Sequence, residues 1–173
     1  MILPETFSRE KNTINAIIET PRGTGNKYAY DVGHDFFHLK KVLPLGTFFP
    51  LDFGFVPHTR GQDGDPFDVL IINDFPSFPG CVIEARIIGV LEASQQQKNR
   101  APIRNDRIMA VASASLCYSH LKKIQDLNPS LLNELVHFFE YYNQMEGKKF
   151  RLLSIQNTKV AIKLIQNNLH IKS

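Results

Sequence analysis

The chain of 173 residues contains no tryptophan and only two cysteines, Cys81 and Cys117. Two cysteines are too few for the disulfide framework of a small secreted protein, so we expect the fold to depend on an apolar core. No run of about 18 apolar residues could span a bilayer. Residues 1–11 carry two glutamates and a proline where a signal peptide has its apolar centre. These absences predict a cytoplasmic protein that does not engage a membrane.

The sequence also lacks a long block of basic residues. Its net charge is +3, from 20 Lys and Arg against 17 Asp and Glu, and this excess is too diffuse to indicate a nucleic-acid partner. Hydrophobic residues make up 43% and charged residues 21%, as in ordinary globular proteins. The length fits one domain, residues 1–173. The basic residues remain available to bind a small polyanion in a cleft.

Short segments rich in β-branched and aromatic residues predict strands. The predicted strands are 16–20, 27–31, 36–42, 69–72, 82–93, 107–112 and 149–155. A leader, residues 1–13, is expected to include a short helix on the surface. The first two strands are expected to pair as a hairpin around the turn 21–26. Residues 43–55 are expected to line the core, and Gly89 predicts a bulge or bend in its strand.

Helices are predicted only near the end of the chain. Asn128 followed by Pro129 is a typical helix start, and apolar residues then recur with a period of 3.6 up to Gly147. A second helix is predicted at 157–169. The fold class is therefore α+β, a small closed antiparallel β-barrel with two C-terminal helices packed outside. The polar segment 94–105 is expected to be a flexible loop.

Asp63-Gly64-Asp65-Pro66-Phe67-Asp68 places three carboxylates within six residues, directly before the apolar run 69–72. Glycine and proline predict a turn here. Three like charges so close repel one another unless a cation or solvent relieves them, and Mg²⁺ prefers such oxygens. Two interpretations stay open on these residues alone, a metal site and a generic acidic turn.

The stretch from Asp63 to Val69 resembles the signature of the soluble family I inorganic pyrophosphatases: acid, small or polar residue, acid, Pro, apolar, acid, apolar. Further segments resemble that family in the same order, so that the resemblance covers roughly residues 15–165. These segments are Ile18-Glu19-Thr20-Pro21, Lys27-Tyr28, Phe49-Pro50, Phe53-Gly54-Phe55, His58-Thr59, Pro79-Gly80, Gly89-Val90-Leu91, and His137-Phe138-Phe139-Glu140 with Tyr142.

The resemblance implies a barrel of the oligonucleotide-binding (OB) type that hydrolyses inorganic diphosphate to two orthophosphates with several Mg²⁺ ions, or with Mn²⁺. It implies Asp65 as the general base. The implied metal ligands are Asp63, Asp68, Glu19 and the residue at position 105, Asn105. The implied phosphate-binding residues are Lys27, Lys41, Arg107 and Tyr142. It also implies a homo-oligomer, with the helix that carries His137 at the subunit contact.

The chain departs from the family pattern at several positions near the expected chemistry. Lys41 stands where the family usually has Arg, which keeps the charge but loses the bidentate fork. Neutral or apolar residues replace polar or charged ones at Ala29, Phe49, Phe53, Gln95, Gln96 and Asn143. Asn105 is an amide where a carboxylate is implied. Its neighbour Asp106 could serve only if the strand register shifted, since one step along a strand turns a side chain to the other face.

Three functions follow from these residues as alternatives. The first is a Mg²⁺-dependent diphosphatase with Asp65 as the base. The second is a non-catalytic relative that binds a phosphorylated ligand or a partner. The third is a phosphohydrolase for a larger anion, in which the basic residues of the segment 94–104 reach the substrate.

Overall fold

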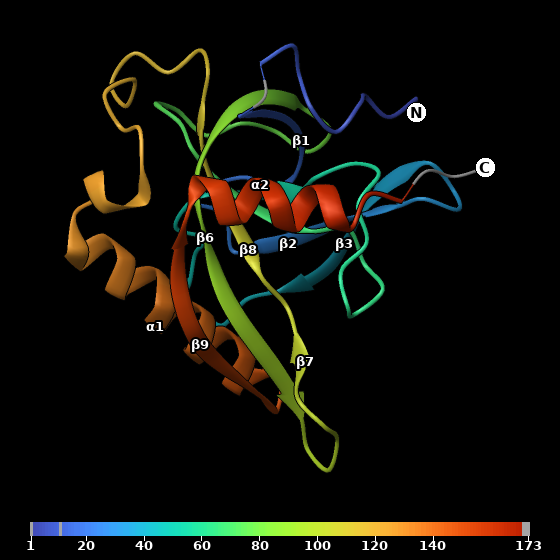
Figure 1. The fold of residues 1–173 in the computed structure, drawn as a ribbon. Helices are drawn as coiled ribbons and strands as arrows, with labels where there is room; N and C mark the ends of the chain where they lie inside the picture. Colours follow the sequence, from blue (N-terminus) through green and yellow to red (C-terminus); the bar gives the residue numbers. More distant parts are fainter. Residues whose placement is uncertain (1, 11, 171–173) are drawn as a thin grey trace.

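The structure is a computed structural model that describes residues 2–10 and 12–170. Five strands form its centre (Figure 1): β1 (Thr13–Thr20), β4 (Asp52–Phe55), β5 (Asp68–Ile72), β8 (Arg107–Ala112) and β6 (Val82–Gln97). Each pairs with the next in this order, and β6 pairs again with β1, so the pairings close a five-stranded ring. The predicted α+β class, with an OB-like barrel and two late helices, is confirmed.

One pairing of the ring differs from the predicted all-antiparallel arrangement. β5 and β8 run parallel, with Asp68 opposite Arg107 and Ile72 opposite Val111. Two parallel strands need a long connection between them. Here the connection contains the long strand β6, which lies between β5 and β8 in the sequence and runs antiparallel to β8. The parallel register places Asp68 and Arg107, two residues of the predicted site, side by side at the start of the two strands.

The second predicted strand does not pair with the first. β2 (Asn26–Asp31) pairs instead with β3 (Phe36–Val42) in a separate two-stranded sheet. Both edges of β1 are already occupied, by β4 and by β6, so no backbone edge remains for β2. Side chains of β1 make the connection: Tyr30 N–H donates to Glu19 Oε1 at 2.8 Å, and Tyr28 N–H donates to Thr20 Oγ1 at 3.1 Å.

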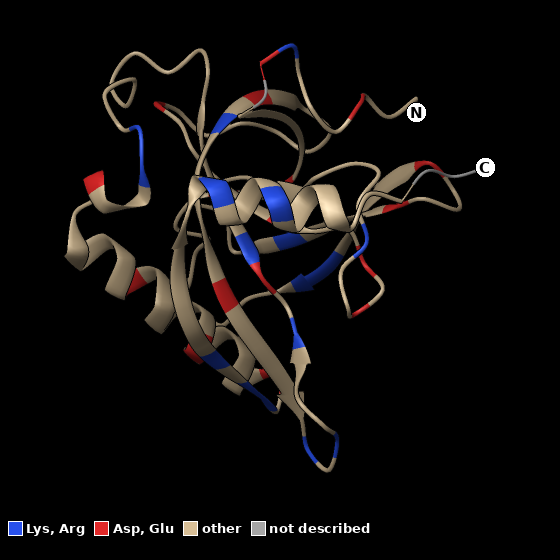
Figure 2. Cartoon of the chain, in the orientation of Figure 1, with Lys and Arg blue, Asp and Glu red and all other residues tan. Residues whose placement is uncertain are grey.

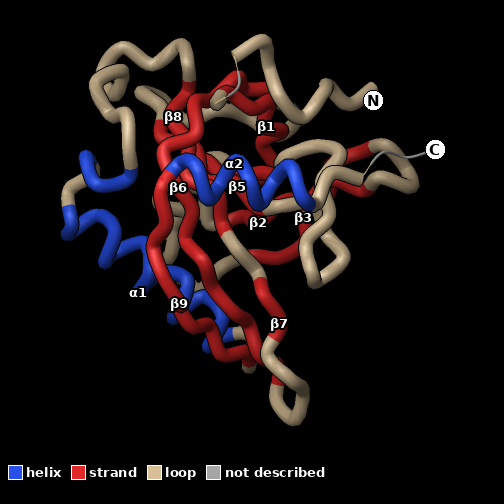
Figure 3. The backbone as a smooth tube through the Cα atoms, in the orientation of Figure 1, coloured by secondary structure: helices blue, strands red, loops and turns tan. Residues whose placement is uncertain are grey.

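The expected flexible loop 94–105 is largely strand. β6 continues to Gln97, because β9 (Lys148–Asn157) offers a free edge that pairs Gln95 with Phe150 and Gln97 with Lys148. After a short turn, β7 (Ile103–Arg104) pairs back with β6. In Figure 3 this hairpin projects well beyond the barrel.

Gly89 lies at a bulge, as predicted, since the β6–β8 register shifts between Ile87 and Gly89. A Cβ atom at this position would lie 2.6 Å from the Gln156 carbonyl oxygen and 2.9 Å from Ile124 Cβ. Only glycine lets β9 and the 3₁₀ turn η1 (Ile124–Asp126) approach the barrel so closely.

The two helices cover different faces of the barrel (Figure 1). α1 (Pro129–Met145) begins at the predicted cap, where Asn128 Oδ1 accepts from Ser130 N–H at 2.9 Å. Its buried Leu135, Phe139 and Tyr142 join the core cluster that includes Phe150. α2 (Thr158–Asn167) contributes Ala161 and Ile165 to the other cluster.

Some expectations for the first third of the chain were wrong. The described part of the leader contains no helix, and Phe7 forms an isolated bridge with Ile14. In the segment 43–55, Phe49, Phe53 and Phe55 are buried, whereas Phe48 is 55% exposed.

Cys81 and Cys117 are free thiols. Within residues 2–10 and 12–170, no helix is long and apolar enough to cross a membrane.

Candidate active site

The three aspartates of the acidic turn line one wall of a cleft of ≈ 590 Å³. The turn is held by its own backbone, because Gly61 N–H donates to the Asp65 carbonyl at 2.7 Å and Asp65 N–H donates to Asp63 Oδ1 at 3.2 Å. Gly64 has a φ of 90°, a conformation that favours glycine. Phe67 is buried and anchors the turn to the core. The carboxylates are therefore presented on a fixed backbone.

The carboxylates of Asp63, Asp68 and Glu19 lie in an environment that disfavours their charge. Burial raises the pKa of Asp63 and of Asp68, and neighbouring carboxylates raise both further. Burial also raises the pKa of Glu19 to about 7, although Tyr30 N–H donates to this carboxylate. Glu19 does not line the cleft, but it lies close enough for the charges of Lys27 and Asp68 to affect its pKa. A bound cation would relieve this repulsion.

The chemistry of the donor atoms decides whether these residues fit a divalent metal ion. Among the described residues, no group of three or more His, Cys, Asp or Glu side chains stands in a ready-made metal-holding arrangement. The donors at the cleft are nonetheless carboxylate oxygens, and burial disfavours the charged forms of Asp63 and Asp68, whose pKa values it raises. Mg²⁺ is held in proteins by one or two carboxylates together with waters and substrate phosphates. The donor set therefore fits such an ion.

Arg107 forms the floor of the cleft and is 2% exposed. Its Cζ lies 4.2 Å from the centre of the Phe139 ring and 4.9 Å from that of Phe150. Nη2 lies 3.9 Å from Asp68 Oδ2, and Nη1 donates to the Asn105 carbonyl at 2.9 Å. The buried Nε has no partner in the described part of the chain. A buried donor without an acceptor is costly, which favours an oxygen ligand at this position.

Lys27 and Tyr142 complete the inner part of the cleft. The Lys27 ammonium lies 4.9 Å from the Phe53 ring centre and 5.4 Å from that of Tyr142. In residues 2–10 and 12–170 it has no hydrogen bond or ion pair, and burial lowers its pKa. The buried Tyr142 hydroxyl likewise has no partner there. These free donors beside Arg107 are suited to anionic oxygens.

Lys41 lies 3.9 Å from the Tyr142 ring centre and forms an ion pair with Glu146. Glu146 also accepts from Lys148 Nζ at 2.9 Å, so one carboxylate bridges the hairpin β2–β3 and strand β9. Burial and the nearby ammonium groups lower the pKa of Lys41. Lys40, Glu146 and Lys148 line the cleft but were not predicted, since isolated charged residues carry no local signal.

Asn105 contacts the acidic turn directly. Its Nδ2 donates to Asp63 Oδ2 at 3.0 Å and to Gln95 Oε1 at 3.2 Å. Gln95 lines the cleft. Gln96 does not line it, and its side chain donates to the Arg100 carbonyl. The amide thus gives Asp63 a hydrogen bond but no negative charge.

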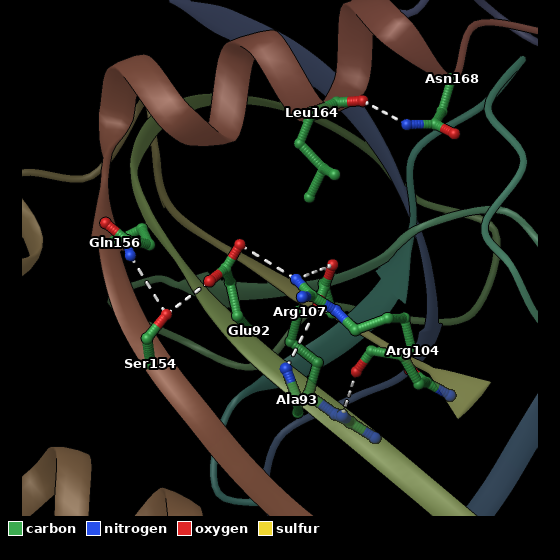
Figure 4. A network of polar contacts seen from close by, with 10 residues as sticks. Glu92, Ala93, Arg104, Arg107, Ser154, Gln156, Leu164 and Asn168 are labelled. Atoms are coloured by element: carbon green, nitrogen blue, oxygen red, sulfur yellow. Dashed lines mark hydrogen bonds and ion pairs between the residues drawn. The ribbon is translucent and has the colours of Figure 1, made fainter. Parts of the chain in front are cut away.

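Asp106 does not take the place of Asn105. It is 5% exposed, accepts from Arg104 Nε and Nη2 at 3.0 and 2.9 Å, and accepts from Ala93 N–H at 2.9 Å. Figure 4 shows that Arg104 also pairs with Glu92 and that Glu92 accepts from Ser154. The suggested shift of register is absent, because Ser94 pairs with Arg104 and Leu91 pairs with Arg107 in one continuous register. Asp106 does not line the cleft, and it borders a second pocket of ≈ 230 Å³ that Asp63, Asp68 and Asn105 also line.

Comparison with known proteins identifies relatives over nearly the whole chain. The sequence profile of the family described as Inorganic pyrophosphatase matches residues 16–171. The inorganic pyrophosphatase of Halalkalibacterium halodurans is 36% identical over 156 residues, which are 90% of this chain and 93% of that protein. The one from Nostoc is 38% identical over 156 residues, 90% and 89% of the two chains.

The crystal structure of the inorganic pyrophosphatase from Thermus thermophilus superposes with a TM-score of 0.88 and 30% identity, covering 96% of this chain and 94% of that one. The inorganic pyrophosphatase structure from Helicobacter pylori gives a TM-score of 0.87 at 28% identity, covering 98% and 97%. Sequence and fold agree along the same residues, and this chain belongs to the inorganic pyrophosphatase family.

Proposed function

We propose that this chain hydrolyses inorganic diphosphate to two orthophosphates. The observation that carries the proposal is the cleft itself, in which the carboxylates of the acidic turn share one space with Lys27 and Arg107. Carboxylates suit an activating cation, and unpartnered cationic or hydroxyl donors suit phosphate oxygens. Family membership and the names of the relatives support the same reaction.

In the proposed reaction, Asp63 and Asp68 would hold Mg²⁺, with Glu19 and Asn105 as further residues of the site. A bound ion would supply a Lewis acid for phosphate oxygens and would lower the pKa of water at the site. Asp65 accepts the proton of the attacking water as general base. The water oxygen forms a bond to one phosphorus while the bridging P–O bond breaks, and orthophosphate leaves.

The cationic residues act on the phosphates rather than on the water. Arg107 and Lys27 stabilise the negative charge that develops on the leaving phosphate, and the Tyr142 hydroxyl donates to a phosphate oxygen. Lys41 binds the second phosphate group, and this contact competes with the ion pair between Lys41 and Glu146. The rings of Phe53, Phe139 and Phe150 lower the local dielectric around these groups, which strengthens each interaction.

Orthophosphate release from diphosphate in the presence of Mg²⁺ or Mn²⁺ tests the proposal. Asp65→Asn is expected to lower kcat by about a hundredfold to ten-thousandfold, because the base is lost. Asp65 is exposed, so this variant should fold normally. Glu84→Gln, an exposed residue of β6 outside the cleft, is the control and should keep full activity. No turnover by the unaltered chain, or equal turnover by Asp65→Asn, contradicts the proposal.

One observation favours a second candidate, a protein that binds diphosphate without hydrolysing it. Asn105 fills the space beside Asp63 with a neutral amide, which leaves less negative charge to hold an activating cation. Calorimetric binding of diphosphate together with no orthophosphate release would establish this function instead of the first.

We also propose that the chain forms a homo-oligomer through α1, whose exposed surface carries Tyr141 and Met145 at 45% and 56% exposure. Light scattering coupled to size exclusion measures the mass, and a monomer at micromolar concentration contradicts the proposal. Tyr141→Glu should reduce the mass, whereas Lys163→Glu on the exposed face of α2 should not.

A further inference from the structure

Asp106 lies between two residues of the site, Asn105 and Arg107, but does not itself line the cleft. In Figure 2, an acidic position lies between two basic ones where β7 passes into β8. The three residues share one short stretch of backbone. Contacts that hold the Asp106 side chain therefore also hold the backbone of its two neighbours.

The backbone hydrogen bonds between β6 and this stretch are irregular. Ala93 of β6 lies opposite Asn105, because the register of β6 is continuous from its pairing with β7 to the start of its pairing with β8. In a regular antiparallel ladder, two such residues exchange either both hydrogen bonds or none. Here Asn105 N–H donates to the Ala93 carbonyl at 2.9 Å. Ala93 N–H, however, donates to Asp106 Oδ1 at 2.9 Å instead of returning the bond.

The Asn105 carbonyl is therefore directed elsewhere, and it accepts from Arg107 Nη1 at 2.9 Å. In the described part of the chain, this is the closest polar contact of the guanidinium. Nη2 lies 3.9 Å from Asp68 Oδ2, and Nε has no partner there. A carbonyl that took part in the ladder would point across to the neighbouring strand. The anchor of the guanidinium thus depends on the bond between Asp106 and Ala93.

Arg104 fixes the Asp106 carboxylate at both oxygens. Its Nε donates to Oδ1, the oxygen that also accepts from Ala93, at 3.0 Å, and its Nη2 donates to Oδ2 at 2.9 Å. Such a bidentate contact fixes orientation as well as distance. Arg104 Nη2 also lies 3.0 Å from Glu92 Oε1 (Figure 4), and Glu92 accepts from Ser154 of β9. The carboxylate is thereby held by groups of β6, β7 and β9.

A buried carboxylate is an expensive way to satisfy one backbone N–H. Asp106 is 5% exposed, and burial of a charge is unfavourable unless the charge is paired and hydrogen-bonded. A regular ladder would satisfy Ala93 N–H with the neutral carbonyl of Asn105 and would need no charge at this position. What the charged arrangement adds is the free carbonyl beside Arg107.

We propose that Asp106, held by Arg104, is a positioning residue that acts through Arg107. By accepting from Ala93 N–H, it leaves the Asn105 carbonyl to anchor Nη1, and this fixes the direction in which the guanidinium meets phosphate oxygens. Asp106 itself contacts no substrate. The inference rests on the proposed role of Arg107 in binding phosphate. Without the carboxylate, Ala93 N–H pairs with the Asn105 carbonyl and the guanidinium loses its anchor.

Two variants of similar shape isolate the acceptor. Asp106→Leu has none, whereas Asp106→Asn keeps Oδ1 for Ala93 N–H and Arg104 Nε. Titration calorimetry with orthophosphate and Mg²⁺ should show an affinity about fivefold lower for Asp106→Leu, as for one lost hydrogen bond to a charged group, and a change of less than about twofold for Asp106→Asn. Equal losses in both variants, or no loss in either, overturn the proposal.

Asp126→Leu is the control for the loss of a carboxylate that accepts from backbone N–H groups. Asp126 accepts from those of Lys122 and Lys123 and does not line the cleft. Its replacement should change orthophosphate affinity less than about twofold. A loss as large as that of Asp106→Leu would show that a general loosening of the fold weakens phosphate binding, and would overturn the proposal.

A double-mutant cycle with Arg107→Lys distinguishes positioning from a purely structural role. Lysine has no Nη1, so adding Asp106→Leu to Arg107→Lys should change orthophosphate affinity less than about twofold. A further fivefold loss in that background would mean that Asp106 acts by another route, and the proposal would fail. The proposal also fails if Arg107→Lys binds orthophosphate as tightly as the unaltered chain.

The cycle needs no turnover, so its result is independent of the diphosphatase assay. If the chain binds orthophosphate without hydrolysing diphosphate, the diphosphatase function fails and coupling in the cycle still supports positioning. If diphosphate is hydrolysed and the cycle shows no coupling, only the present inference fails.

Urea unfolding establishes that each variant is folded. If Asp106→Leu is not, Arg104→Gln replaces it in the cycle, since the Arg104 side chain is 34% exposed and its loss releases the carboxylate. Arg104→Gln should weaken orthophosphate about threefold in the unaltered chain and have no effect beside Arg107→Lys. The same affinity with and without Arg104→Gln overturns the proposal.

Discussion

Asn105 donates a hydrogen bond of 3.0 Å from its side-chain amide to the Asp63 carboxylate. The amide relieves the crowded negative charge of the acidic turn without adding any of its own. Two carboxylates at these positions would repel each other, whereas the amide of Asn105 and the carboxylate of Asp63 form a hydrogen bond. The cost is a smaller attraction for a divalent cation at this end of the cleft.

The first prediction concerns this pair. Asn105→Asp should raise Mn²⁺ affinity about tenfold, because a further carboxylate faces the ion. In EDTA the same variant should be less stable by about 1 kcal/mol, since Asp63 then faces a like charge. Calorimetry and thermal unfolding measure the two effects. Asn133→Asp makes the same change on the exposed surface of α1 and should alter neither. Unchanged metal affinity would show that position 105 does not reach the bound ion.

The second prediction concerns the guanidinium fork of Arg107. Arg107→Lys keeps the charge but removes Nε and the second amino group, so orthophosphate affinity should fall about tenfold. Phosphate inhibition of diphosphate hydrolysis measures this change, and isothermal titration checks it independently of turnover. Arg151→Lys, on the exposed face of β9, is the matched control. An inhibition constant equal to that of the unaltered chain would place the phosphate elsewhere.

The third prediction is a pH dependence of stability without metal. In the folded chain, burial raises the pKa of Glu19 from 4.5 to about 7. The folded state therefore holds this proton more tightly than the unfolded state. Its contribution to stability is complete below about pH 4.5 and is lost as the pH rises through 7. Glu19→Gln should remove that loss.

Urea unfolding in EDTA at pH 5 and pH 8 measures the effect. Relative to Glu19→Gln, the unaltered chain should lose of order 2 kcal/mol of unfolding free energy between these pH values. Glu84→Gln, exposed on β6, should follow the unaltered chain at both. Parallel pH curves for Glu19→Gln and the unaltered chain would mean that Glu19 is ionised at neutral pH without cost.

The fourth prediction tests the bulge in β6. Gly89→Ala should destabilise the fold by about 2 kcal/mol or more, because the new methyl group would meet the Gln156 carbonyl and Ile124 at less than 3.0 Å. Gly25→Ala is the control, as its Cβ would have no neighbour closer than 3.4 Å, and it should cost less than about 0.5 kcal/mol. Urea denaturation compares the two. Similar midpoints for both variants would contradict the close approach at Gly89.

Local signals in the sequence were sufficient for several elements. The cap at Asn128 and the 3.6-residue period that follows it predicted α1, because both depend only on neighbouring residues. The bounds of β3 and β8 were predicted without error for the same reason. The acidic turn was recognised from its composition, and the structure places Asp63, Asp65 and Asp68 in the cleft together.

Features that depend on distant partners were not predictable in this way. The parallel pairing of β5 with β8 and the extension of β6 to Gln97 are decided by which edges remain free after the barrel closes. Lys148 enters the cleft only because β9 pairs with that extension. The position of Asp106 is decided by contacts with Arg104 and Ala93, which no sequence pattern reveals.

Helix α1 supplies Phe139, Tyr142 and Asn143 to the cleft, and Glu146 follows at its C-terminal end. Their spacing of three, four and seven residues puts them on one side of the helix. Deleting a single residue upstream within α1 would rotate all four by about 100° at once. Length changes are therefore tolerated very unevenly: the turn at 98–102 can grow or shrink, while α1 has to keep its residue count.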